Sequence, residues 1–590
     1  MTDPIRIANC SGFYGDRLAA AQEMVEGGPI DVLTGDWLAE LTMLILQRTR
    51  AKRPGGGYAR TFVTQMDQVM GTCLDRGIKV VTNAGGLDPD HCADAVAEVA
   101  DKLGLSPTIA YVNGDDILGR LDELVAAGVD LAHFDNGEPI GDTSRFITAN
   151  AYLGCWGIVD ALNSGADIVI TGRTTDAAVV CGPAAWHHGW KRDDWDQLAG
   201  AVVAGHIIEC GTQATGGNYS FFTEVAGLTH TGFPWAEVAA DGSCVVGKHD
   251  NTGGEVSVGT VTSQLLYEIA APAYLGPDVT ARFDTIEVEQ TGTDRVLVSG
   301  TKGEPPPSTL KVAMNELGGF RQEIGVGIVG LDIEAKAKLV EEAFWAALPH
   351  NPEDYANVST RLVRTDKEDP ATNEEATASF RIALKDSDDS KLGRQVFNAT
   401  VELGLATIPG FTGLGGGSQK AQPYGVYRPA VVPADLVPQH VVLLGGARTV
   451  VDSVAPTPDT EVSVAPLPGP DGTAPTGPTR RVPMGTIIGT RSGDKGGNAN
   501  LGVFARTDEA WLWLDSFLTT EVLQELLPET SEFAIDRHRL PAILSLNFLI
   551  HGLLEEGVAA STRRDPQAKS LGEWLRARFV EVPVSLLEGA

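Results

Sequence analysis

The first 280 residues alternate short β-branched apolar runs with longer segments in which apolar residues recur every three to four positions. Short continuous apolar runs are typical of buried parallel strands, and the three-to-four spacing indicates amphipathic helices. The pattern therefore predicts an α/β fold with a mainly parallel, layered N-terminal domain over residues 1–280. The expected strands are residues 5–8, 30–33, 79–82, 108–112 and 167–171, and the expected helices include 16–26, 36–50 and 92–103.

The pattern changes beyond residue 280, where strand-like and helix-like runs predict a middle α+β region over residues 281–451. Seven prolines between Pro456 and Pro478, with almost no large apolar residue, predict a linker over residues 452–483. The remaining residues 484–590 predict a small, separable α+β domain. The runs behind these predictions are strands at 285–299, 359–365, 485–489 and 501–505 and helices at 333–347, 392–405, 520–527 and 542–556.

The charge balance limits the kinds of molecule that we expect this protein to bind. Asp and Glu number 78 against 45 Lys and Arg, which gives a net charge of −33 over 590 residues. Such a surface repels nucleic acid and anionic membranes, so neither is expected as a partner. An anionic small molecule would need a local cluster of Arg, Lys or backbone N–H groups.

The sequence lacks the signals of several common classes of protein. The N-terminus shows no secretory pattern and no 18-residue apolar run occurs, so we expect a soluble, cytoplasmic protein. The seven cysteines are scattered without a CxxC pair, which indicates reduced thiols and predicts no metal site. No GxxxxGK[ST], GxSxG or HExxH motif is present, so a P-loop NTPase, a typical esterase and a zincin are unsupported.

The loop after the first expected strand carries Gly12, Gly15 and Arg17. Its N–H groups and the following helix N-terminus are suited to bind an anion, so we assign these residues to substrate binding. The alternative is a tight turn in which Asp16 is the helix N-cap. Only GxxG is present rather than the full dinucleotide fingerprint, so we predict no nicotinamide cofactor.

Two further loops follow expected strands, with Asp36 in one and Asn83 in the other. In open α/β sheets the ligand lies outside the carboxyl ends of the strands. We therefore expect both residues to converge with the first loop, Asp36 as a catalytic carboxylate and Asn83 as a substrate-binding residue. The alternative is that Asp36 only caps a helix.

Arg173 and Asp176 follow the strand at 167–171. Arg173 offers a permanent, planar charge to a carboxylate or phosphate, and Asp176 either orients it or acts as a base. The alternative is an internal ion pair that closes the loop.

His206 and Glu209 lie three positions apart, so on a helix they share one face. A neighbouring carboxylate raises the basicity of an imidazole, and the pair could then perform acid–base catalysis. The alternative is a buried structural histidine. Cys210 is a weaker nucleophile candidate, because nothing nearby in the sequence stabilises its thiolate.

In the last domain, residues 490–500 combine three glycines with two cations and several polar side chains. This stretch predicts an anion-binding turn in which Arg491, Ser492, Lys495 and Asn498 bind the substrate. The alternative is a hairpin in which Asp494 pairs with a neighbouring cation. A second basic stretch at 563–569 could join the same face.

These motifs resemble the acyclic terpene utilisation protein AtuA family, formerly a domain of unknown function. The segments that resemble its main domain, up to about residue 450, are GFYGDR, GDWLAELT, TNAGG, ADIVITGRTTDAA and AGHIIECGTQATGGN. The segments GTRSGDKGGNANLGVFAR and RRDPQAKSLG resemble its C-terminal domain, which is similar to a ferredoxin-like α+β fold. The resemblance implies a role in the breakdown of acyclic terpenoids such as citronellol and geraniol, whose acids are processed as CoA thioesters beside a biotin-dependent carboxylase. It assigns no catalytic residues.

We therefore expect an enzyme of acyclic terpenoid or branched acyl-CoA catabolism with hydratase or lyase type acid–base chemistry. CoA would enter only as part of the substrate, with no separate cofactor. The alternative is a non-catalytic subunit that binds acyl-CoA or a biotin-dependent carboxylase partner. A third reading is a dehydrogenase that uses the loop between Gly12 and Gly15. A homo-oligomer is expected from the frequency of such assemblies.

Overall fold

The computed structural model describes residues 2–414, 419–453 and 467–588. The chain forms two compact units. Unit 1 comprises Met1–Asn315, Tyr427–Val558 and Gln567–Ala590, and unit 2 comprises Glu316–Val426 and Ala559–Pro566. Within the described residues, no helix is both long enough and apolar enough to cross a lipid bilayer.

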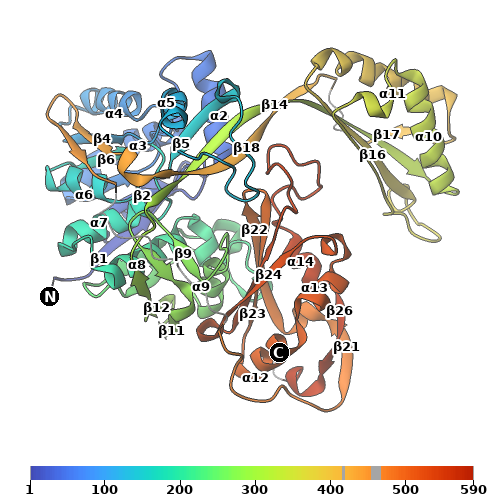
Figure 1. Ribbon diagram of the computed structural model, residues 1–590. Coiled ribbons are helices and arrows are strands. Elements are labelled where there is room, and N and C mark those ends of the chain that lie inside the picture. The colour runs from blue at the N-terminus through green and yellow to red at the C-terminus, as the bar shows by residue number, and fades with distance from the viewer. Residues whose placement is uncertain (1, 415–418, 454–466, 589–590) are drawn as a thin grey trace. The chain divides into compact units, whose positions relative to one another are not determined.

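An eleven-stranded sheet forms the centre of unit 1, in the order β11-β12-β8-β7-β1-β2-β3-β6-β4-β19-β20 (Figure 1). The five central strands pair in parallel, as their short apolar runs predict. They are β1 (Ile5–Asn9), β2 (Val32–Gly35), β3 (Lys79–Thr82), β6 (Ile168–Thr171) and β4 (Ile109–Asn113). Antiparallel strands extend both edges of this parallel centre. The α/β fold class is thereby confirmed.

The antiparallel strands place both ends of the expected middle region, residues 281–451, in the main sheet. Residues 285–299 form a hairpin of β11 (Glu287–Gly292) and β12 (Arg295–Ser299), which joins the main sheet through β8 (Cys244–Lys248). The strands β19 (Gln439–Leu443) and β20 (Arg448–Val451) join it through β4. The compact unit 2 consequently starts at Glu316 and its first segment ends at Val426, inside the expected 281–451.

Helices cover both faces of the main sheet because consecutive strand residues point to opposite sides. On one face, Ala8 and Leu33 pack with α1, α3 and α4. On the other face, Ile7 and Val32 pack with α6, α7 and α8. The first set of helices is α1 (Ala20–Gly27), α3 (Arg60–Arg76) and α4 (Pro89–Leu103), and the second is α6 (Trp156–Asn163), α7 (Ala178–His188) and α8 (Trp195–Ile208).

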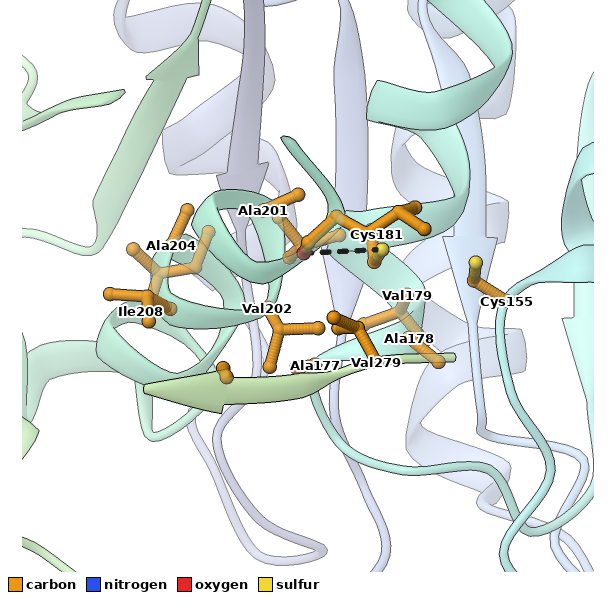
Figure 2. Packing of buried hydrophobic residues seen from close by; sticks show 14 of the residues in the cluster. Cys155, Ala177, Ala178, Val179, Cys181, Ala201, Val202, Ala204, Ile208 and Val279 are labelled. Atoms are coloured by element: carbon orange, nitrogen blue, oxygen red, sulfur yellow. Dashed lines mark hydrogen bonds between the residues drawn. The ribbon is translucent and has the colours of Figure 1, made fainter. Parts of the chain in front are cut away.

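The helices α7 and α8 pack closely through small side chains, as Figure 2 shows for Ala178, Cys181, Ala201 and Ala204. Gly205 of α8 extends this contact, because a Cβ there would lie 2.8 Å from the Cα of Ala177. This close approach fixes the position of the C-terminal end of α8. The residues that follow this end lie in the candidate site.

The C-terminal part of unit 1 is an antiparallel four-stranded sheet in the order β22-β23-β25-β24. A separate two-stranded sheet pairs β21 (Thr479–Pro483), expected in the linker, with β26 (Phe579–Pro583). The helix expected near 542–556 is wrong, because Leu546, Phe548 and Ile550 alternate into the core as strand β25 (Ser545–Ile550). The other elements are β22 (Ile488–Lys495), β23 (Asn498–Ala505), β24 (Ile535–Leu540), α12 (Asp508–Phe517), α13 (Thr520–Leu526) and α14 (Leu571–Arg576). Residues 454–466 of the expected linker lie outside the described residues.

Unit 2 is built on β15 (Asn357–Val363), β16 (Thr377–Asp386) and the long strand β14 (Thr309–Val329), which are antiparallel neighbours. The helices α10 (Ile333–Ala347) and α11 (Arg394–Ala406) pack on one face of this sheet. Helix α10 has the predicted bounds, and α11 begins two residues later than expected. In this sheet β5 (Phe146–Ala151), β17 (Thr412–Gly413) and β18 (Gln422–Pro433) also pair with β14. Strand β5 belongs to unit 1, and β14 and β18 run through both units.

Candidate functional site

The loops after β1, β2 and β3 meet, as the strand-end rule predicts. Asn83 Nδ2 donates to Asp36 Oδ1 at 2.5 Å, and Asn83 Oδ1 accepts the N–H of Trp37 at 2.8 Å. The N–H of Asp36 donates to the carbonyl of Ser11 at 2.9 Å, which ties the first loop to the second. Asp36 is not the N-cap of α2 (Glu40–Lys52), because its side chain turns inward to Asn83 and the helix begins later.

Arg173 connects the loop after β6 to the loop after β2. Its side chain is buried, and Nη1 donates to the carbonyl of Leu38 at 2.9 Å and to Asp176 Oδ1 at 2.7 Å. The guanidinium carbon lies 4.1 Å from the ring centroid of Tyr152. The Arg173–Asp176 ion pair is therefore present, and the same guanidinium also reaches the neighbouring loop.

Glu40 adds a carboxylate that the sequence analysis did not single out. Its Oε1 accepts the hydroxyl of Tyr152 at 3.2 Å and lies 3.4 Å from Nζ of Lys311. Burial opposes ionisation, but Lys311 and Arg173 outweigh it and lower the pKa of Glu40 to about 2. The side chains of Glu40 and Lys311 remain 29% and 34% exposed, so a ligand could reach these charges from solvent.

Glu209 and His206 lie together at the end of α8, as their spacing predicts. His206 Nδ1 is 3.2 Å from Glu209 Oε1, and the imidazole packs against the rings of Tyr274 and Phe283. Burial and the nearby Lys495 lower the pKa of His206 to about 4, so the expectation that the carboxylate makes this imidazole more basic is wrong. The imidazole is neutral at physiological pH.

We call the carboxyl groups of Asp36, Asp176, Glu209 and Glu268, with the side chains around them, the carboxyl cluster. Asp36 and Glu209 of this cluster hold their protons more strongly than usual. Burial raises the pKa of Asp36, and the charges of Asp176 and Glu209 raise it further. Burial likewise raises the pKa of Glu209, with further contributions from Asp176 and Glu268. A buried carboxyl group that keeps its proton beside other carboxylates is suited to acid–base chemistry.

Several buried polar atoms here have no hydrogen-bond partner among the described residues. They are Glu209 Oε2, His206 Nε2, Arg173 Nε, Thr174 Oγ1 and the hydroxyl of Tyr427. A buried polar atom without a partner costs about 1–3 kcal/mol, and such atoms are rare in native proteins. Their concentration in one cluster indicates a place where a polar ligand or water makes up the missing bonds.

The β22–β23 hairpin brings cations to the same cluster. Arg491 donates to Gln213 and stacks 4.0 Å from the ring centroid of Tyr267. Lys495 Nζ donates to the carbonyl of Glu268 at 2.8 Å. The expected loop is instead two paired strands that turn at residues 496–497, but Arg491 and Lys495 do face the main domain.

The C-terminal sheet also holds the backbone of the main domain in a strained form. Glu268 has a left-handed φ of 55°, which is unusual for a residue with a side chain. Its N–H donates to Oδ1 of Asn500 on β23 at 2.8 Å. The contact fixes the position of the Glu268 carboxyl group, whose pKa is raised by burial.

The other predicted binding residues have different surroundings. Gly12 packs directly on the backbone of Cys210, where a Cβ would come within 2.4 Å, and Gly15 is exposed. Arg17 is engaged by Glu23 at 2.5 Å and by the carbonyl of Thr231, and Asp16 closes the first loop instead of capping α1. Ser492 accepts the N–H of Gly572, and Asn498 donates to Asp135. Gly12, Arg17, Ser492 and Asn498 are therefore engaged in structural contacts outside the carboxyl cluster, several of them between distant parts of the chain.

Asp115 lies beneath Arg173 and positions it. Its Oδ2 accepts the backbone N–H of Arg173 at 3.0 Å and the amide of Asn150 at 2.8 Å. Burial raises the pKa of Asp115 to about 7, although both hydrogen bonds oppose the shift. The folded state consequently keeps a proton here that the unfolded chain releases near pH 4.

The substitution Asp115→Asn is expected to remove a loss of stability that the wild type suffers as the pH rises. Between about pH 4 and about pH 7 the folded state binds more protons than the unfolded state, so the free energy of unfolding falls by on the order of 4 kcal/mol. Asparagine accepts the same two hydrogen bonds through Oδ1. Urea unfolding of both proteins across this range measures the difference, and parallel pH curves would contradict the prediction.

The polar groups of the cluster are carboxyl, imidazole, guanidinium, ammonium, phenol and hydroxyl groups. Within residues 2–414, 419–453 and 467–588, no group of three or more His, Cys, Asp and Glu side chains is arranged to hold a metal ion. The cations Arg173, Lys311, Lys495 and Arg491 are the groups suited to an anionic ligand.

Comparison with known protein families matches two segments of the chain. A model of the acyclic terpene utilisation family protein AtuA matches residues 5–443, and a model of the AtuA ferredoxin-like domain matches residues 482–581. No curated protein matches the chain. The first match contains the strand-end loops and the second contains the β22–β23 hairpin, which confirms the resemblance inferred from the motifs. With most of its length matched in this way, the chain belongs to the acyclic terpene utilisation protein AtuA family.

Proposed function

We propose that this protein is an enzyme of acyclic terpenoid breakdown that catalyses a hydratase or lyase type reaction on a branched acyl-CoA thioester. The observation that carries the proposal is that Arg173 links the Asp36 loop to Asp176 at the carboxyl ends of the parallel strands, and that Glu209 is close enough to raise the pKa of Asp36. Hydration or elimination next to a thioester carbonyl needs only an acid, a base and stabilisation of the enolate charge. The cluster contains a group of each kind.

The proposed division of work follows from the charges. Glu209 and Asp36 have raised pKa values, so one carboxyl group donates a proton while the other accepts one. In hydration, the base removes a proton from water, the oxygen adds to the β-carbon, and the acid protonates the α-carbon. Arg173 and Lys495 supply positive charge near the thioester oxygen, where negative charge develops.

The direct test is turnover by the purified full-length chain. Branched and isoprenoid 2,3-unsaturated acyl-CoAs and their 3-hydroxy counterparts are incubated with the protein, and the gain or loss of water is followed by mass spectrometry. Conversion of the branched compounds in preference to straight-chain ones supports the proposal. Binding without conversion would overturn the catalytic role and favour an acyl-CoA-binding subunit, for which co-purification with a biotin-dependent carboxylase is the next measurement.

The substitution Lys495→Met is expected to raise KM for the acyl-CoA by about tenfold or more, because a charge-assisted contact contributes roughly 1.5–3 kcal/mol. Lys302→Met is the matched control, since Lys302 forms a surface ion pair with Asp196 at 2.8 Å and is 63% exposed. Steady-state kinetics of both variants measure the effect. Equal KM values for the two variants would remove Lys495 from the binding group.

A further inference from the structure

The sheet of unit 2 places like charges directly opposite each other. The register sets Arg361 of β15 opposite Arg381 of β16, and Arg321 of β14 opposite Lys385 of β16. The alternate residues of β14 and β16, such as Ile382, pack beneath α10 and α11, so all four cations belong to the face that the helices leave uncovered. Like charges directly opposite each other destabilise a sheet. An anion bound among these cations therefore stabilises this face.

A segment from the far end of the chain crosses this face. Arg321 Nη1 donates to the carbonyl of Ser561 at 3.2 Å, and Arg361 Nη1 donates to the carbonyl of Thr562 at 3.0 Å. The segment Ala559–Pro566 thereby brings the exposed Arg564 to the sheet. This segment contains the start of the basic stretch 563–569, and it lies outside the carboxyl cluster of unit 1.

The sheet and the segment border a recess with an empty volume of about 350 Å³, part of which is open solvent. Three arginines are among the residues that line it, Arg361, Arg381 and Arg564, together with Ser359. The one carboxylate among its lining residues is Glu323, whose Oε1 lies 3.1 Å from Nη1 of Arg381. Both members of that pair are about half exposed, at 50% and 40%, so water screens the pair and leaves Arg381 available to a second anion. Three cations against one anion leave a local excess of two positive charges in a chain with a net charge of −33.

We propose that this recess is a binding site for the phosphate group of an organic phosphate. A phosphate carries close to two negative charges at neutral pH, which matches the local excess. Guanidinium groups hold phosphate oxygens with two parallel hydrogen bonds each, and a serine hydroxyl adds a further donor. The small number of residues that line the recess favours a single phosphate over an extended polyanion. If the proposed function is correct, the phosphates of CoA are the source, and the other source of the same chemistry is free inorganic phosphate.

The test measures binding to the full-length protein by calorimetry at constant ionic strength set with chloride. The probes are inorganic phosphate, CoA and dephospho-CoA, which lacks the 3′-phosphate. Arg361→Gln and Arg381→Gln are each expected to weaken phosphate binding by about tenfold or more, because each removes a charged contact. Glu323→Gln is expected to change affinity in the opposite direction and tighten binding, since it removes the one repelling charge.

Arg364→Gln is the matched control, because it removes an arginine of unit 2 that is paired with Asp366 and Glu334 and does not line the recess. Folding is checked by the midpoint of thermal unfolding, which Arg381→Gln should not lower since it relieves a like-charge pair. A weaker affinity for CoA in the recess variants, with a smaller effect on dephospho-CoA, supports the site with the 3′-phosphate as its occupant. An effect on inorganic phosphate alone supports the site with free phosphate as the occupant.

Unchanged affinity for all three probes in Arg361→Gln and Arg381→Gln overturns the proposal, as does an equal loss in Arg364→Gln, which would mark a general charge effect. Failure of the proposed function gives a different result. In that case no acyl-CoA is converted, while the phosphate affinities still respond to the recess substitutions.

Discussion

Replacement of Glu209 by glutamine is expected to lower kcat/KM for the acyl-CoA substrate by about 10²–10⁴-fold, the usual contribution of a positioned acid or base. Oε1 of Glu209 lies beside the neutral His206, and Oε2 has no partner among the described residues, so it is the atom free to exchange a proton. Glutamine has the same shape and no proton to give. The variant should therefore fold normally and lose the chemical step.

The pH dependence provides a second readout for Glu209. Its raised pKa means that the protonated form persists to higher pH than for an ordinary glutamate, and activity that needs this proton falls as the pH rises through the folded pKa. Glu209→Gln should remove that descending limb from the residual activity. The control is Glu224→Gln, because Glu224 forms an exposed ion pair with Arg506 and lies outside the cluster. If Glu209→Gln retains kcat/KM within about threefold of the wild type, an acid–base role for this residue is excluded.

Replacement of Arg173 by methionine is expected to lower the free energy of unfolding by about 1.5–3 kcal/mol or more, because it removes the charged hydrogen bond to Asp176, whose side chain is 28% exposed, and leaves the carbonyl of Leu38 without its donor. The guanidinium is 1% exposed and holds Asp176, the carbonyl of Leu38 and the ring of Tyr152 together. It also supports the low pKa of Glu40. Methionine has a similar length and no charge, so the packing is retained and the electrostatic loss dominates.

Urea unfolding of the variant measures this loss, with Arg506→Met as the matched control. Arg506 also forms a bidentate pair, with Glu224 at 2.9 Å, but it is 44% exposed and is expected to contribute less than about 1 kcal/mol. A double variant with Asp176→Asn should recover part of the loss, because the unpaired carboxylate is then removed. Equal unfolding free energies for Arg173→Met and Arg506→Met would show that the buried network contributes little.

The main architecture follows from local patterns in the sequence. The run at residues 79–82 and the helix at 333–347 have the predicted bounds, and the other parallel strands differ from prediction by only a few residues. Apolar β-branched runs mark buried strands because both faces of a parallel sheet are covered. This signal is weak at residues 545–550. The sequence predicts a helix there, but the structure has a strand whose alternate residues pack in the core.

The same local logic reaches part of the candidate site. Asp36, Asn83, Arg173 and Asp176 each follow a strand directly, so the strand-end rule predicts that they meet, and they do. Arg17 illustrates the limit of the rule, because it also follows a strand yet pairs with Glu23 of the next helix. Contacts with residues that are distant in the sequence decide whether a strand-end side chain points toward the candidate site.

By itself, the sequence determined the layered α/β fold, the family and the strand-end half of the candidate site, because these depend on periodicity and on motifs that are continuous in the chain. Only the tertiary structure brought Lys311 and Glu268 to Glu40 and Glu209, and laid residues 559–566 across the arginines of unit 2. These contacts join residues far apart in the chain, and no local spacing encodes them. The protonation state of His206 also depends on the tertiary structure. The neighbouring carboxylate in the sequence predicts a more basic imidazole. Complete burial instead removes the water that would stabilise its charge and lowers its pKa to about 4.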